Sequence, residues 1–146
     1  MDTNFISTQE EVNKFLKELK EIISSNNFNV EKDLDIILKK KNENLLDPYT
    51  TQNTLLTLNF DKYDIVDTLK SLTDRDYIET GNDIKNNQLP KLYIFGKEIH
   101  GRVIYIKIKI RDKINHKMFC ISFHFARYPL TKFPYAWLGG VYKWIC

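Results

Sequence analysis

The fold expected for this chain is decided by two short runs, RVIYIKIKIR at residues 102–111 and KMFCISFHF at residues 117–125. Isoleucine occupies alternate positions of the first run from Ile104 on, and Phe or Ile occupies alternate positions of the second run from Phe119 on. Alternation with a period of two is typical of strands that bury one face. We therefore predict that the two runs form an antiparallel β-hairpin.

The register of this hairpin is restricted, because both apolar sets must lie on the same buried face. With a turn at residues 112–117, paired residue numbers sum to 229, which places Ile110 opposite Phe119 and Tyr105 opposite His124. The other face would then carry Tyr105, Lys107, Lys109, Arg111, Ser122 and His124. This face has cations, a phenol and an imidazole but no carboxylate, which favours an anion as its ligand. The alternative is an ordinary exposed lysine-rich face that discourages aggregation.

Length and composition indicate one globular domain spanning residues 1–146, with 42% hydrophobic and 13% aromatic residues. The sequence has neither a long apolar run nor a signal-peptide pattern, so we expect no membrane span and a cytoplasmic location. Cys120 lies in a predicted strand and Cys146 is the last residue, and both are expected to be reduced thiols.

Charge is distributed unevenly along the chain. Residues 1–83 carry 10 Lys/Arg and 17 Asp/Glu, a net charge of −7, whereas residues 84–146 carry 12 and 2, a net charge of +10. Such segregation favours a polyanionic partner for the C-terminal half. A protein partner with an acidic surface would also explain it.

Two helices are expected in the N-terminal half. Thr8 and Glu11 form a capping-box signature, and apolar residues then recur at three- and four-residue spacing as far as Ser24. Asn59 or Asp61 is expected to cap a second helix. Residues 28–41 fit a strand or a helix equally well, and residues 42–53 are expected to be a loop. The predicted fold class is α+β, with an antiparallel twisted sheet in the C-terminal half and the N-terminal helices packed on one face.

The position of Lys97 depends on the turn at His100 and Gly101. A two-residue loop would pair Lys97 with Ile104 and bury the ammonium group, which is costly. A three-residue loop with Gly101 in a bulge would place Lys97 beside Tyr105, and this is the arrangement that we expect.

The histidines do not predict a metal site. His100 and His116 would lie near opposite ends of a strand, roughly 30 Å apart, so that one ion could not bind all three histidines. We expect His100 and His116 to be turn residues, and neither a metal nor a cofactor to be needed. The sequence also lacks glycine-rich nucleotide loops and zinc-binding motifs.

His124 is the strongest candidate for chemistry. An imidazole with a pKa near 6.5 can move protons at neutral pH, and the predicted register places it against Tyr105. Cleavage of RNA without a metal requires a base for the 2′-hydroxyl, cations for the developing charge and an acid for the 5′-oxygen. A satisfied or solvent-facing strand histidine is the alternative.

Four motifs, in order, resemble a known family. They are LTDRDY at residues 72–77, LYIFGKE at residues 92–98, VIYIKI at residues 103–108 and CISFH at residues 120–124. Together they resemble the motility quorum-sensing regulator (MqsR) type of RelE-like toxins over roughly residues 8–130, leaving the tail at residues 131–146 unassigned. The resemblance implies a small α/β toxin fold, sequence-selective cleavage of mRNA, and neutralisation by a cognate antitoxin.

The resemblance also assigns roles to residues. The catalytic tyrosine of the family matches Tyr105, whereas two of its lysines fall on Glu79 and His124. Lys97 would then supply the missing cation and His124 the acid or base.

The resulting hypothesis is a toxin of a type II toxin-antitoxin system that acts as a metal-independent endoribonuclease. Its catalytic residues would be Lys97, Tyr105 and His124, and its phosphate- and RNA-binding residues would be Lys107, Lys109, Arg111 and Arg127. The alternative is a non-catalytic RNA-binding or protein-binding module that uses the same face, with Tyr105 stacking on a base. A less favoured alternative is an antitoxin or transcriptional regulator, because no helix-turn-helix pattern is present.

Overall fold

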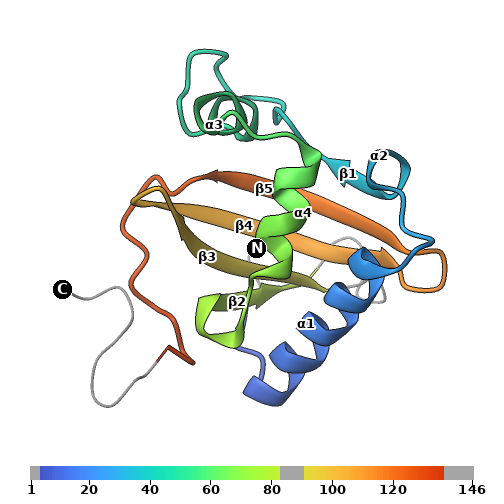
Figure 1. The fold of residues 1–146 in the computed structure, drawn as a ribbon. Helices are drawn as coiled ribbons and strands as arrows, with labels where there is room; N and C mark the ends of the chain where they lie inside the picture. Colours follow the sequence, from blue (N-terminus) through green and yellow to red (C-terminus); the bar gives the residue numbers. More distant parts are fainter. Residues whose placement is uncertain (1–3, 83–90, 137–146) are drawn as a thin grey trace.

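The protein, described by a computed structural model at residues 4–82 and 91–136, consists of a five-stranded sheet and four α-helices (Figure 1). The elements are α1 (Gln9–Ser24), α2 (Val30–Asp33), β1 (Leu34–Ile36), α3 (Thr51–Leu58), α4 (Lys62–Lys70), the 3₁₀ turn η1 (Asp74–Asp76), β2 (Tyr77–Gly81), β3 (Leu92–Ile99), β4 (Arg102–Asp112) and β5 (Lys117–Phe125). The strands lie in the order β1-β5-β4-β3-β2. The predicted α+β class is confirmed.

The sheet is mixed, whereas the sequence predicted an antiparallel one. Strands β2 to β5 pair antiparallel, but β1 pairs with β5 in parallel, with Leu34 opposite Met118. The ambiguous stretch at residues 28–41 contains both kinds of structure, since one helical turn at α2 precedes the three residues of β1. Three residues are too few for alternation to reveal a strand, and alternation reports the buried face of a strand and not its direction.

The two predicted helices are confirmed. Thr8 and Glu11 exchange the two hydrogen bonds of a capping box at the start of α1. Asp61 caps α4 in the same way with Asp64, whereas Asn59 ends α3 in a left-handed conformation with a φ of 58°. The loop predicted at residues 42–53 ends earlier than expected, because Thr50 caps α3.

The main core lies between one face of the sheet and helices α1 and α4 (Figure 1). Helix α1 contributes Val12, Phe15, Leu16, Leu19, Ile22 and Ile23, and α4 contributes Ile65, Val66 and Leu69. The four alternating isoleucines of β4 all point into this core, as predicted. The opposite face of β4 and β5 is therefore the face that carries their polar side chains.

A β-bulge at Ile121 changes which residues of β5 are buried. Tyr105 lies opposite His124 as predicted, but beyond Lys107 the register shifts, and Ile110 lies opposite Met118 and not opposite Phe119. One extra residue in a strand reverses the side-chain directions that follow it. The core therefore contains Met118 and Cys120, while Phe119 lies half-buried on the other face.

The turn between β3 and β4 also differs from the prediction. His100 and Gly101 form a two-residue loop with φ values of 52° and 80°, the combination that a type I′ turn requires. Lys97 consequently pairs with Ile104 and does not lie beside Tyr105 as had been predicted. His116, in the β4–β5 turn, has a φ of 58°, so both histidines are turn residues as predicted.

Within residues 4–82 and 91–136, no helix is long and apolar enough to cross a membrane. Cys120 is a free, buried thiol, and burial raises its pKa to about 12. Of the unassigned tail, Phe133 and Ala136 are buried and Tyr135 stacks on Tyr77. Cys146 and the rest of the tail lie outside the described residues.

Candidate active site

The candidate site lies on the sheet face opposite α1 and α4, where β4 and β5 run side by side. Register pairs Tyr105 with His124 and Lys107 with Ser122, so these four side chains share one face. The site residues predicted from alternation are therefore brought together in this part of the hairpin, where the register has not yet shifted.

Tyr105 and His124 form a stacked pair. Their ring centroids are 5.2 Å apart and the rings are 18° from parallel. Nδ1 of His124 lies 2.9 Å from the carbonyl oxygen of Phe125. Because a carbonyl oxygen can only accept, Nδ1 is the protonated nitrogen, and in the neutral ring Nε2 carries the lone pair.

The surroundings of His124 favour the neutral form of its ring. Burial lowers the pKa of His124, the charges of Lys40 and Arg127 lower it further, and the hydrogen bond to Phe125 opposes them. A neutral imidazole with its outer nitrogen unprotonated is the form that accepts a proton.

Lys40 lies at this site, although the sequence pattern did not assign it there, because a run of three lysines beside a loop is usually solvated. Its ammonium group donates a 2.7 Å hydrogen bond to Oγ of Ser122, which places it on the same face as Lys107. Burial lowers the pKa of Lys40, as do the charges of Lys107 and Arg127, while Glu43 opposes them. Lys40 lies in a loop 82 residues before Ser122, so no local pattern could have associated the two.

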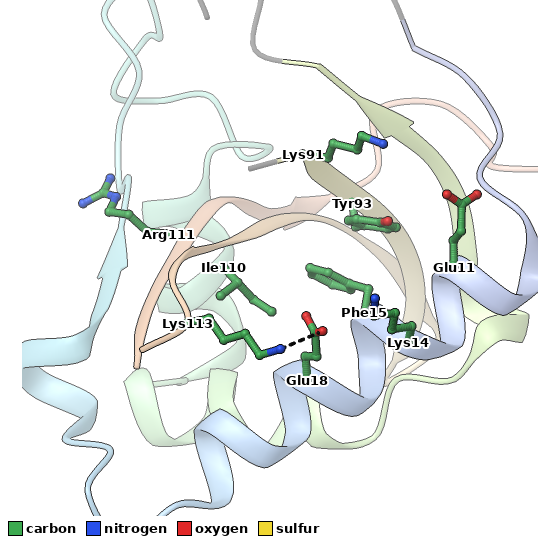
Figure 2. Close-up of a pocket in the computed structure, with 9 residues that line it drawn as sticks. All are labelled: Glu11, Lys14, Phe15, Glu18, Lys91, Tyr93, Ile110, Arg111 and Lys113. Carbon is green, nitrogen blue, oxygen red and sulfur yellow. Dashed lines mark hydrogen bonds and ion pairs between the residues drawn. The ribbon is translucent and has the colours of Figure 1, made fainter. Parts of the chain in front are cut away.

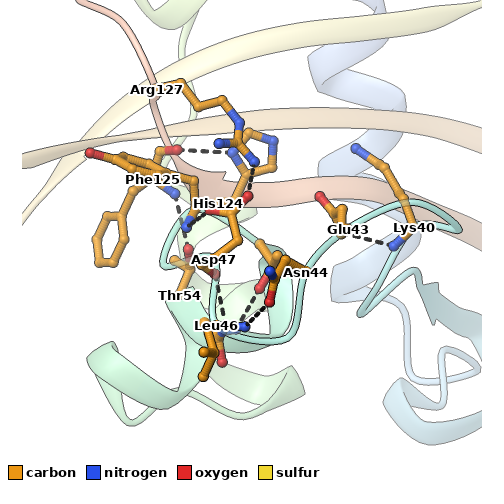
Figure 3. A network of polar contacts seen from close by, with 12 residues as sticks. Lys40, Glu43, Asn44, Leu46, Asp47, Thr54, His124, Phe125 and Arg127 are labelled. Carbon is orange, nitrogen blue, oxygen red and sulfur yellow. Dashed lines mark hydrogen bonds and ion pairs between the residues drawn. The ribbon is translucent and has the colours of Figure 1, made fainter.

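The loop that carries Lys40 is held by hydrogen bonds of three kinds, which lie within the loop, between Arg127 and its Asp47, and between β5 and the following helix α3 (Figure 3). The backbone N–H of Lys40 donates to Glu43. Further along, hydroxyls of Thr51 and Thr54 accept from the backbone N–H groups of Phe123 and Phe125. Helix α3 thereby satisfies the edge of β5 beyond the end of β1, and the loop before it is fixed beside the site.

Arg127 stands at the site but is already paired. It forms an ion pair with Asp47, and its guanidinium lies 5.3 Å from the ring centroid of Tyr49. The hydrogen bond from Arg127 holds the pKa of Asp47 below its usual value. In Figure 3 the His124 ring lies between the side chains of Arg127 and Lys40.

Lys109 and Arg111 continue the basic face away from the pair of rings. Both lie over Phe119, with distances to its ring centroid of 5.6 Å and 4.3 Å respectively. Arg111 also forms a 2.8 Å ion pair with Asp35 of β1. The bulge thus places the Phe119 ring beneath Lys109 and Arg111, two of the predicted RNA-binding residues, whereas regular alternation would have placed this ring in the core.

Lys97 does not belong to this site. Its pairing with Ile104 directs it to the helix side of the sheet, where its ammonium lies 3.7 Å from Asp76 and 3.5 Å from the carbonyl oxygen of Ser71. The expected cooperation of Lys97 with Tyr105 and His124 is therefore wrong. The two-residue turn is the cause, because it shifts Lys97 by one position and so to the other face.

A cavity of about 200 Å³ opens beside the stacked rings. Its lining is formed by Tyr105, His124, Ala126, Arg127, Tyr128 and Leu130. Tyr128, which contributes to this lining, is 77% exposed. A planar apolar group beside a phosphate would fit the chemistry of these walls.

The ion pairs reveal a second reason for the uneven charge distribution. Each of the five found among the described residues joins a cation after residue 90 to a carboxylate before residue 80. Part of the basic half is therefore matched to the acidic half within the fold. Lys40, Lys107 and Lys109 take no part in these five pairs.

A second cavity, of about 420 Å³, lies between α1 and the sheet (Figure 2). Phe15 and Tyr93 stack within it, with centroids 4.0 Å apart, and the ammonium of Lys113 donates to Glu18 at 3.0 Å on its rim. Carboxylates alternate with cations there, unlike on the face that carries His124.

No group of three or more possible metal-binding side chains occurs within residues 4–82 and 91–136. No protein-family model, curated protein or solved structure matches this chain.

Proposed function

We propose that this protein is an RNA-cleaving toxin, an endoribonuclease that needs no metal and whose active site contains Tyr105 and His124. The observation that supports it most is the hydrogen bond of Nδ1 of His124 to Phe125, which leaves Nε2 as the proton-accepting atom, with the cations Lys40 and Arg127 nearby. A base and nearby positive charge are two of the three elements that cleavage by the 2′-hydroxyl requires, and the third is an acid for the 5′-oxygen.

In the proposed reaction, Nε2 of His124 accepts the proton of the 2′-hydroxyl while that oxygen attacks the adjacent phosphorus. The bond from phosphorus to the 5′-oxygen breaks, which leaves a 2′,3′-cyclic phosphate and a 5′-hydroxyl. The leaving 5′-oxygen takes up a proton from an acid on the opposite side of the phosphorus. Tyr105 holds the His124 ring in position by stacking on it, and Lys107 stabilises the charge on the phosphorane. Arg127 would contribute once a phosphate competes with Asp47 for its guanidinium.

Purified protein incubated with single-stranded RNA in excess chelator tests this function. We expect cleavage at defined positions, with cyclic phosphate ends, and arrest of growth when the protein is produced without a cognate antitoxin. Intact RNA together with normal growth, at full solubility of a folded protein, would contradict the proposal.

A non-catalytic RNA-binding module is the second candidate. The cavity beside Tyr105, with its apolar walls and the exposed Tyr128, would suit a stacked base without any chemistry. Binding of RNA that stays intact over hours would favour this candidate over the nuclease.

A further inference from the structure

Three features of Lys40 reduce the stability of the folded protein, and such features are expected mainly where they serve a function. Lys40 is half-buried, its charged neighbours are the cations Lys107 and Arg127 as well as the carboxylate of Glu43, and none of the ion pairs among the described residues joins it to a carboxylate. Desolvating a cation beside other cations costs free energy. Such arrangements are concentrated at functional sites.

The position of Lys40 relative to His124 is suited to a phosphate between them. The ammonium group of Lys40 lies 2.7 Å from Oγ of Ser122. Ser122 and His124 are two residues apart in a regular part of β5, so their side chains lie on the same face. Same-face positions of a strand are about 6.6 Å apart. A phosphorane with its attacking and leaving oxygens in line would fit between a base at one position and an acid at the other.

Tyr105 is less well placed to protonate the leaving oxygen. Its ring stacks on that of His124 at 5.2 Å, so the two groups lie on the same side of such a phosphate. In an in-line displacement the proton donor must stand opposite the base. Lys40 meets that condition because it approaches from the loop beyond β5.

We propose that Lys40 is the proton donor to the 5′-oxygen that leaves when RNA is cleaved at this site. The inference rests on the ribonuclease function proposed above. As the 2′-oxygen bonds to phosphorus and passes its proton to His124, the bond to the 5′-oxygen breaks and that oxygen takes a proton from Nζ of Lys40. Lys40 ends neutral and His124 charged, and exchange of protons with water restores both.

The groups that face Lys40 support this role. Glu43 of its own loop, Lys107 of β4, Cys120 of β5 and Arg127 all influence its charge, and His124 lies nearby. Burial, together with the two cations, lowers the pKa of Lys40, which brings an ammonium closer to the range in which it donates a proton.

The test uses a short RNA containing one cleaved bond and a second RNA in which sulfur replaces the 5′-oxygen at that bond. Sulfur leaves without protonation, so we expect Lys40→Ala and Lys40→Arg to slow cleavage of the oxygen substrate by about 100-fold or more, and that of the sulfur substrate by less than about 10-fold. Both variants should also lose the alkaline limb of the pH–rate profile. Lys39→Ala, in the adjacent exposed position, is the matched control and should cut both substrates at the wild-type rate.

Lys40→Arg keeps the positive charge, but a guanidinium does not release its proton over the pH range of the pH–rate profile. If it cuts at the wild-type rate, or if Lys40→Ala slows both substrates equally, Lys40 is not the proton donor, although the ribonuclease function stands. If the wild-type protein cuts neither substrate, the ribonuclease function itself fails. Thermal unfolding of each variant shows whether it is still folded at the temperature of the cleavage assay, which excludes loss of activity through loss of fold.

Discussion

The His124 side chain is held by two contacts that serve chemistry as well as stability. Stacking on Tyr105 fixes the plane of the ring, and donation from Nδ1 to Phe125 fixes its tautomer. A strand histidine that merely faced solvent would need neither contact. These contacts also mean that replacing His124 will have a measurable stability cost, unlike replacement of a fully exposed residue.

His124→Ala should therefore lower both activity and stability, by very different amounts. We expect RNA cleavage to fall by about 100-fold or more, the usual contribution of a positioned base. Loss of the stacking and of one hydrogen bond should cost about 1 to 2 kcal/mol in urea unfolding. His100→Asn is the control, because asparagine tolerates the left-handed turn conformation and His100 lies in the β3–β4 turn and does not line the cavity beside His124. Equal cleavage rates for both variants would refute a catalytic role for His124.

Acidification should destabilise the protein through the same residue. Because the pKa of His124 is lower in the folded protein than its usual 6.5, the unfolded chain binds more protons as pH falls below that value. The stabilising contribution is complete above about pH 6.5 and is lost as pH falls towards the lowered pKa. We expect the melting temperature to drop between pH 7.5 and pH 5 in the wild type and to drop less in His124→Gln. If the melting temperature of His124→Gln falls between pH 7.5 and pH 5 by as much as that of the wild type, the pH dependence does not come from His124.

At the scale of elements, the bulge at Ile121 is where the sequence pattern fails. Alternation correctly predicted both strands, the buried isoleucines and the contact of Tyr105 with His124, because the hairpin is regular there. Alternation wrongly predicted that Phe119 is buried in the core, because the sequence gives no sign of the extra residue that reverses the side-chain directions beyond the bulge. Lys40 was missed for a different reason, since contacts between a loop and a distant strand carry no periodicity.

The bulge predicts that replacing Met118 destabilises the protein more than replacing Phe119, and regular alternation would predict the opposite ranking. Met118→Ser removes a side chain that is only 1% exposed in the core, and should cost about 3 kcal/mol or more. Phe119→Ser removes a half-buried ring from the opposite face and should cost less, about 1 kcal/mol. Urea unfolding of the two variants measures the difference. The opposite ranking would mean that β5 runs without the bulge.

Helix α3 makes a separate contribution, as a cover for the edge of β5. Thr54→Val keeps the shape of the side chain but leaves the N–H of Phe125 without its acceptor, so we expect a loss of about 1 to 3 kcal/mol. Thr57→Val, on the exposed side of the same helix, controls for helix propensity and should be nearly neutral. Equal unfolding midpoints in urea would show that this hydrogen bond does not hold α3 to the sheet.

For the molecule as a whole, the ion pairs between its two halves change what the net charge of the C-terminal half implies. A charge of +10 on residues 84–146 favours binding of many phosphates, as the sequence alone suggested. Within the fold, Arg111, Lys113, Lys117 and Arg127 are each matched to a carboxylate. The cations left for RNA on the candidate face are mainly Lys40, Lys107 and Lys109, so the binding surface is smaller than the sequence implied.

RNA affinity should accordingly depend on salt only moderately. Neutralisation of about three phosphates of a single strand gives a slope of about −2 in a plot of log K against log salt, or a loss of roughly 20-fold in affinity between 50 and 200 mM. Fluorescence anisotropy with a non-cleavable 2′-deoxy strand measures it without interference from cleavage.

The same titration distinguishes the two faces of the sheet. Lys107→Met should reduce the slope by about 0.7, the value for one phosphate contact. Lys113→Met should leave it unchanged, because Lys113 is paired with Glu18 beside α1, on the helix side of the sheet. A slope that falls equally in both variants, or that is flat in the wild type, would mean that RNA does not bind through the face carrying His124. A slope of −4 or steeper would mean instead that the internal ion pairs open and their arginines turn to the phosphates.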